Sequence, residues 1–216
     1  MKRKVLLDEL IRNYPELSEL RDSIDKVSGI IVKCYTAGGK LLICGNGGSS
    51  SDSCHIAGEL MKSFERERPL DVSLKNRLAD ISADRGKYLA DKLEHGLPAI
   101  SLSAHSSLIT AICNDIDPQL IFAQQILGYG EEKDVLLAIS TSGNSENIID
   151  ACITARAMNM TVVGMTGRSG GKMKEYCDIL INVPREKTAS VQEIQLPVYH
   201  TICRIVEEYF YGGEQD

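Results

Sequence analysis

The chain has 216 residues, a formal net charge of −6 and an apolar content of 43%. This length suits one domain with a sizeable core, and the acidic balance argues against nonspecific nucleic-acid binding, which needs a basic surface. Tryptophan is absent and aromatic residues make up only 5% of the chain. The core must therefore be built mainly from aliphatic side chains.

Residues 1–37 have the apolar spacing of helices. Pro15 interrupts the first apolar stripe and can serve as the first residue of a second helix. Gly38 and Gly39 then end that second helix. We expect an N-terminal helical segment at 1–37, followed by the main domain at 38–212.

The main domain alternates between short apolar runs and helical patterns. The apolar runs predict five strands, at residues 41–44, 99–102, 135–139, 161–165 and 178–183. Such alternation predicts a three-layer α/β/α sandwich, with a mainly parallel five-stranded sheet covered by helices on both faces. A last helix is expected from about Ser190, where Ser190 and Glu193 fit a capping box.

A charged stretch at residues 65–98 interrupts this alternation. Its leucines still recur at helical spacing, whereas flexible linkers are poor in leucine. We therefore expect an ordered excursion of one or two amphipathic helices, the last of them ended by Gly96.

Cysteine usage and the N-terminus indicate the compartment. The seven cysteines include no C-x-x-C pair, and most lie in apolar patterns, which favours free thiols in a reducing compartment. The apolar run at 5–7 ends at Asp8, too soon for a signal-peptide core, and no run is long enough to span a bilayer. We expect a cytoplasmic protein with no membrane partner.

Two loops of small residues follow predicted strands, at 45–51 and 140–145. Ligands of open parallel sheets bind at the carboxyl ends of strands, where backbone N–H groups and helix N-termini hold anions. Neither loop has the lysine of a P-loop or a GxGxxG with a downstream acid. An ordinary turn with helix-capping hydroxyls explains either loop alone, but the matching pair favours a phosphate site.

His55 and Glu59 lie one helical turn apart, just after the first loop, so both can face one point. With His200 they are residue types that bind zinc, and Glu59 is equally a candidate base. Gln192 and His200 lie about 12 Å apart on an ideal helix. They reach one ion only if the helix bends at Pro197 or if subunits share the site. From spacing alone, an ordinary surface pair of His55 and Glu59 is the favoured alternative.

Several stretches together resemble the sugar isomerase (SIS) domain family and, within it, the phosphoheptose isomerases. These stretches are AGGKLLICGNGGSSSDSCHIAGEL, ICND, EKDVLLAISTSGNS, GMTGRSGGKM and the spacing of Gln192 and His200. The resemblance covers roughly residues 36–64 and 99–210. It implies a homotetramer with active sites at subunit interfaces, one Zn2+ ion per subunit and a phosphorylated sugar substrate.

The resemblance also implies roles by position. The implied zinc ligands are His55, Glu59, Gln192 and His200. The implied substrate contacts are Asn46, Gly47, Gly48, Ser49, Glu59, Asn114, Asp115 and Gln192, with a phosphate cradle of Ser140, Thr141, Ser142 and Ser145. In the implied aldose–ketose isomerisation through an enediol, Glu59 is the candidate base and His200 the candidate acid. Because a tightly bound ligand is not a free base, Glu59 changes its binding mode during turnover.

The chain departs from the family pattern near the sugar end. The excursion at 65–98 is longer than the usual loop, Ser63 and Lys62 stand where an arginine is expected, and Ala189 replaces an aspartate. The expected activity is conversion of sedoheptulose 7-phosphate to D-glycero-D-manno-heptose 7-phosphate. Two alternatives stay open. One is the same chemistry on another sugar phosphate; the other is a noncatalytic sugar-phosphate-binding or scaffold protein, like the replication-initiator-associating members.

Overall fold

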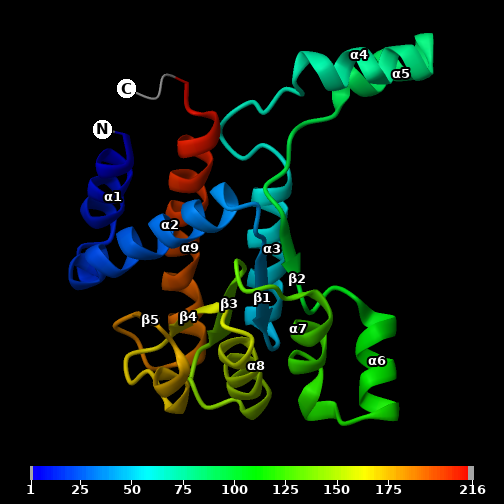
Figure 1. The fold of residues 1–216 in the computed structure, drawn as a ribbon. Helices are drawn as coiled ribbons and strands as arrows, with labels where there is room; N and C mark the ends of the chain where they lie inside the picture. Colours follow the sequence, from blue (N-terminus) through cyan, green and yellow to red (C-terminus); the bar gives the residue numbers. More distant parts are fainter. Residues whose placement is uncertain (1, 214–216) are drawn as a thin grey trace.

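A five-stranded parallel sheet forms the centre of the protein, as a computed structural model describes it for residues 2–213 (Figure 1). The strand order is β2-β1-β3-β4-β5 and every neighbouring pair is parallel. The strands are β1 (Leu41–Gly45), β2 (Ala99–Ser101), β3 (Val135–Ser140), β4 (Thr161–Thr166) and β5 (Ile179–Asn182). The predicted strands and the parallel sheet are confirmed.

Helices precede, separate and follow the strands. They are α1 (Lys2–Asn13), α2 (Arg21–Thr36), α3 (Gly48–Met61), α4 (Val72–Ile81), α5 (Ala83–Lys92), α6 (Ser106–Asp115), α7 (Ala123–Tyr129), α8 (Glu146–Ala157) and α9 (Thr188–Tyr211). Short 3-10 segments are η1 (Pro15–Leu20), η2 (Pro118–Leu120) and η3 (Lys172–Tyr176). Pro15 does begin a helical segment, η1, which leads directly into α2.

The predicted start of the last helix and the predicted end of the excursion helices are wrong. α9 begins at Thr188 with Lys187 at its N-cap, so Ser190 lies inside the first turn and no capping box forms. α5 ends at Lys92, before Gly96. The chain leaves the helix early because the segment after α5 pairs with the segment before α4. The His95 N–H donates to the Arg68 carbonyl at 2.8 Å.

Side chains of successive strand residues enter two separate cores. Leu41 and Ile43 of β1 pack with α1, α2, α3 and α9, whereas Leu42 and Cys44 pack with α7 and α8. Every residue of β1 and β3 is buried, as expected of a parallel sheet covered on both faces. The predicted three-layer arrangement is confirmed, and both termini of the described chain lie near the same end of α9 (Figure 1).

The excursion at 65–98 is an ordered helical hairpin, as predicted. The helices α4 and α5 pack mainly on each other and extend away from the sheet (Figure 1). Asp71 caps α4 by accepting the Leu74 N–H at 2.8 Å, which stabilises the first turn. Val72 and Ile81 are 73% and 84% exposed.

Between residues 2 and 213, no helix has the length and apolar character needed to cross a bilayer. All seven cysteines are free thiols, and four of them are buried: Cys34, Cys44, Cys152 and Cys203.

A buried ion pair anchors the base of the excursion. Arg68 and Glu207 are each 1% exposed, and Arg68 Nη2 lies 2.8 Å from Glu207 Oε1. The Glu207 carboxylate also accepts the backbone N–H groups of Phe64 and Glu65, each at 2.8 Å. Arg68 in turn donates to the carbonyl of Glu59 at 3.1 Å. The pair therefore ties the end of α3 and the start of the excursion to α9.

Glu207→Ala is predicted to destabilise the protein by about 3–5 kcal/mol, because it leaves the Arg68 charge buried and unpaired. Two backbone N–H groups also lose their acceptor. The measurement is the loss of thermal and urea stability at fixed protein concentration. The matched control is Glu65→Ala, which removes a half-exposed carboxylate paired with Arg204 at 2.9 Å and should cost about 0–1 kcal/mol. Equal losses in the two variants would contradict the prediction.

Candidate functional site

The two small-residue loops lie at the same edge of the sheet. β1 and β3 are parallel neighbours, so the residues that follow each strand meet at their carboxyl ends. The side-chain amides of Asn46 and Asn147 exchange hydrogen bonds of 2.8 and 3.1 Å. The first loop therefore touches the first turn of α8.

The first loop is shorter than predicted, because α3 begins at Gly48 and not after residue 51. Gly47 has φ +56°, a left-handed conformation that glycine adopts without strain. Ser49 N–H then bonds to the Asn46 carbonyl at 3.0 Å. The serines expected in the loop thus form the first turn of α3, and Ser49 itself is buried.

The second loop is braced by the segment after β4. Gly143 has φ +66°, and a Cβ there would lie 2.2 Å from the Gly170 carbonyl oxygen. Ser140 Oγ accepts the Gly143 N–H at 3.2 Å and lies 3.2 Å from Ser145 Oγ. Ser145 is the N-cap of α8, but its side chain makes no cap hydrogen bond. The Ile148 N–H already bonds to the Ser145 carbonyl at 3.1 Å, so an anion at this end of α8 would bind the N–H groups of Glu146 and Asn147.

Two imidazoles and a carboxylate meet where α3 packs against α9. His55 Nε2 lies 3.2 Å from Glu59 Oε1 and 3.4 Å from His200 Nε2. Lys62 Nζ lies 3.0 Å from the other Glu59 oxygen, Oε2. Desolvation by burial, together with the nearby His55, lowers the pKa of His200. We refer to His55, Glu59 and His200 as the imidazole–carboxylate cluster.

Gln192 lies apart from this cluster, at the start of α3. A Cβ on Gly48 would come within 2.2 Å of Gln192 Nε2, so the amide covers the first residue of that helix. α9 continues as one helix through Pro197, and Gln192 and His200 remain eight positions apart on it. The four predicted zinc ligands are therefore not assembled around one point within residues 2–213.

The imidazole–carboxylate cluster offers two imidazoles and one carboxylate as donors. In the described part of the chain, no group of three or more His, Cys, Asp or Glu side chains is arranged so that it could hold a metal ion. The donor set of the imidazole–carboxylate cluster nevertheless has the chemistry that zinc prefers. The roles predicted for its residues remain predictions.

Asn114 and Asp115 lie outside the site within this chain. They form the last turn of α6, are exposed, and bond to each other at 2.7 Å. Figure 1 shows α6 beyond α7 on the far side from α9.

Sequence reasoning missed two residues behind the cluster. Tyr199 Oη lies 3.1 Å from His55 Nδ1 and donates to Asp52 Oδ1 at 3.2 Å. Burial raises the pKa of Asp52, an effect that the Tyr199 hydrogen bond partly offsets, and burial beside Asp52 raises the pKa of Tyr199. Asp52 precedes His55 by one helical turn, which was a detectable signal; Tyr199 gave none, since its contact depends on how α9 packs.

Comparisons with known proteins identify the family of the chain. A family profile described as "SIS domain" matches residues 8–92 and 83–167. The phosphoheptose isomerase of Laribacter hongkongensis is 36% identical over 211 residues, which cover 96% of this chain and 94% of that protein. The phosphoheptose isomerase of Methylibium petroleiphilum is 41% identical over 200 residues, covering 91% and 84% of the two chains. The chain belongs to the phosphoheptose isomerase family of SIS domain proteins.

Solved structures of this family have the same fold. A phosphoheptose isomerase from Francisella tularensis superposes with a TM-score of 0.75 at 30% identity, covering 96% of this chain and 97% of that one. The phosphoheptose isomerase from Neisseria gonorrhoeae gives a TM-score of 0.73 at 31% identity, covering 93% and 94%. The sequence resemblance and the predicted fold class are thereby confirmed.

Gly143→Ala is predicted to weaken the binding of inorganic phosphate about tenfold or more. An alanine at this left-handed, tightly packed position costs about 1–3 kcal/mol of strain and displaces the loop that would hold the anion. Calorimetric titration with phosphate measures the effect, and circular dichroism checks that the fold is kept. The matched control, Gly128→Ala, adds a methyl group to an open site on α7 and should leave binding unchanged. Unchanged binding in Gly143→Ala would show that this loop does not hold phosphate.

Proposed function

We propose that this chain is an aldose–ketose isomerase that converts sedoheptulose 7-phosphate to D-glycero-D-manno-heptose 7-phosphate. The observation that carries the proposal is the imidazole–carboxylate cluster, which joins α3 and α9 of a chain related to phosphoheptose isomerases over most of its length. A noncatalytic scaffold has no need of a carboxylate held between an imidazole and an ammonium group.

The phosphate end of the substrate is proposed to bind at the sheet edge. Ser140, Thr141, Ser142 and Ser145 supply hydroxyls there, and α8 adds the N–H groups of its first turn. Asn46, Gly47 and Gly48 are proposed to contact the sugar at the start of α3, with Gln192 beside them. Hydroxyl and N–H donors replace the water that solvates a phosphate dianion.

The reaction moves one proton between neighbouring carbons and another between neighbouring oxygens. Glu59 removes a proton from the C1 hydroxymethyl group of the ketose and returns it to C2, with an enediol between the two steps. His200 moves a proton between the C1 and C2 oxygens, so that the overall charge is unchanged. Lys62 Nζ lies 3.0 Å from Glu59 Oε2 and would hold the carboxylate in place beside the substrate.

Zinc is the cofactor that we propose for this site. His55, Glu59 and His200 would hold it, and Gln192 would join them only by moving its side chain or from a second copy of the chain. When bound, zinc polarises the substrate oxygens and lowers their pKa. Glu59 then has two duties, as ligand and as base, which it performs at different stages of turnover.

We also propose a homotetramer with active sites at subunit interfaces. The exposed position of Asn114 and Asp115 supports this assembly, since these predicted substrate contacts reach a site only from another copy. The seven free thiols support a cytoplasmic location, where cysteines stay reduced.

Glu59→Gln is predicted to lower the isomerisation rate about 10²–10⁴-fold, the usual contribution of a general base. Phosphate binding and thermal stability should stay close to those of the wild type, because glutamine has nearly the same shape. The assay uses sedoheptulose 7-phosphate beside five- and six-carbon ketose phosphates, with the seven-carbon substrate expected to react fastest. Glu65→Gln serves as the control, because Glu65 is an exposed carboxylate just after the end of α3. An unchanged rate in Glu59→Gln would remove this residue from the proton transfer.

Removal of metal is predicted to abolish most activity. Dialysis against a chelator should lower turnover at least about tenfold, and Zn2+ should restore it while Mg2+ should not. Imidazole ligands suit zinc, whereas Mg2+ prefers oxygen ligands. Metal analysis before and after dialysis accompanies the rate measurement. A metal-free sample with full activity would exclude zinc from the mechanism.

A further inference from the structure

A chain of hydrogen bonds leads from the imidazole–carboxylate cluster into the protein. His200 Nε2 lies 3.4 Å from His55 Nε2, His55 Nδ1 lies 3.1 Å from Tyr199 Oη, and Tyr199 donates to Asp52 Oδ1 at 3.2 Å. Both nitrogens of the His55 ring therefore have a polar partner. Glu59 Oε1 also lies 3.2 Å from Nε2, so Tyr199, on the Nδ1 side, is the partner that stands outside the predicted catalytic set.

The direction of the bonds follows from the number of available protons. An ionised carboxylate can only accept, so Asp52 receives the single hydroxyl proton of Tyr199. The Tyr199 oxygen then accepts a proton from His55, which must carry its hydrogen on Nδ1. In a neutral imidazole this leaves Nε2 with a lone pair. That lone pair can accept the Nε2–H of His200, 3.4 Å away.

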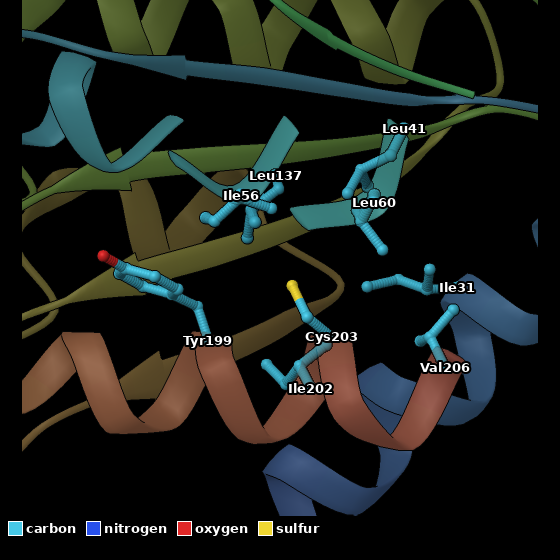
Figure 2. A pocket seen from close by; sticks show the side chains of 9 residues that line it. All are labelled: Ile31, Leu41, Ile56, Leu60, Leu137, Tyr199, Ile202, Cys203 and Val206. Carbon is cyan, nitrogen blue, oxygen red and sulfur yellow. The ribbon is translucent and has the colours of Figure 1, made fainter. Parts of the chain in front are cut away.

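Core packing fixes Tyr199 in the position that this direction requires. Its side chain is 1% exposed, and its ring lines a small apolar cavity between α3, α9 and the sheet. Figure 2 shows the ring beside Ile56, with the hydroxyl pointing away from Cys203 and Val206. The core side of the ring is purely apolar, so the hydroxyl finds its hydrogen-bond partners only on the α3 side, at Asp52 and His55.

We propose that Tyr199, oriented by Asp52, is a positioning residue that holds His55 in the Nδ1–H tautomer and directs Nε2 at the cluster. Reversal of the bonds would place a hydrogen on Nε2 and block that nitrogen as a ligand or acceptor. The inference deepens the proposed function, and it rests on that function only where His55 is taken as a zinc ligand. Outer partners of this kind commonly change metal affinity 10–100-fold.

The first test determines the His55 tautomer in metal-free protein. The chain has four histidines, so ¹⁵N-histidine labelling gives a simple magic-angle-spinning spectrum, in which His55→Gln identifies the His55 signals. In spectra recorded at about pH 8.5, His55 is expected to carry its hydrogen on Nδ1 and a lone pair on Nε2. Tyr199→Phe should abolish this preference. A wild-type His55 protonated on Nε2, or an unchanged tautomer in Tyr199→Phe, would overturn the proposal.

The second test measures Zn2+ affinity by competition with a chelating dye. Tyr199→Phe should weaken binding about 10–100-fold, because His55 loses the partner that orients it. Tyr35→Phe is the matched control, since the Tyr35 hydroxyl is buried without a hydrogen-bond partner in the described chain. That variant should bind zinc like the wild type, and thermal melting verifies that both variants fold. Equal affinity in Tyr199→Phe and the wild type contradicts the positioning role.

These measurements separate the inference from the proposed function, because neither uses turnover. A chain that binds zinc and shows the Tyr199-dependent tautomer, yet does not isomerise heptose phosphates, would support Tyr199 and reject the proposed reaction. A wild-type chain that binds no zinc would reject the proposed cofactor, and the tautomer measurement would then decide the role of Tyr199.

Discussion

The packing of α9 along α3 is the constraint on which the site depends. The two helices run in the same direction, and they touch at three levels. Gln192 covers Gly48 at the start, and His200 meets His55 about two turns further on. Near the end of α3, Glu207 binds Arg68, which also donates to the Glu59 carbonyl. A shift of α9 along α3 by a single turn would separate the His55 and His200 imidazoles from each other. It would also break the buried ion pair of Arg68 and Glu207.

The parallel sheet provides the other half of the site. Because β1 and β3 are parallel neighbours, the loops that follow them lie side by side. No contact between distant side chains is needed to bring these loops together. The Asn46–Asn147 amide pair and the contact of Gly143 with Gly170 then fix the loops in detail. The meeting of the two loops thus follows from topology, whereas the imidazole–carboxylate cluster follows from helix packing.

The α4–α5 hairpin is compatible with this geometry because its two ends are held close together. Ser63 donates to the Glu94 carboxylate at 2.8 Å, and the Arg68 carbonyl accepts the His95 N–H. Closing a loop whose ends already pair costs little extra free energy as the loop grows. The α4–α5 hairpin therefore fits into the chain after α3 without moving Glu59. The Glu59 carbonyl remains bonded to Arg68.

The sequence by itself determined the order of strands and helices, the two small-residue loops and the one-turn spacing of His55 and Glu59. These features depend on local periodicity and on residues a few positions apart. Only the tertiary structure decided that α3 starts at Gly48, that Gln192 lies apart from His200, and that Tyr199 joins Asp52 to His55. The contacts of Gln192 with Gly48 and of Tyr199 with Asp52 and His55 join segments more than a hundred residues apart. The rotation and depth of a packed helix are set by the whole core.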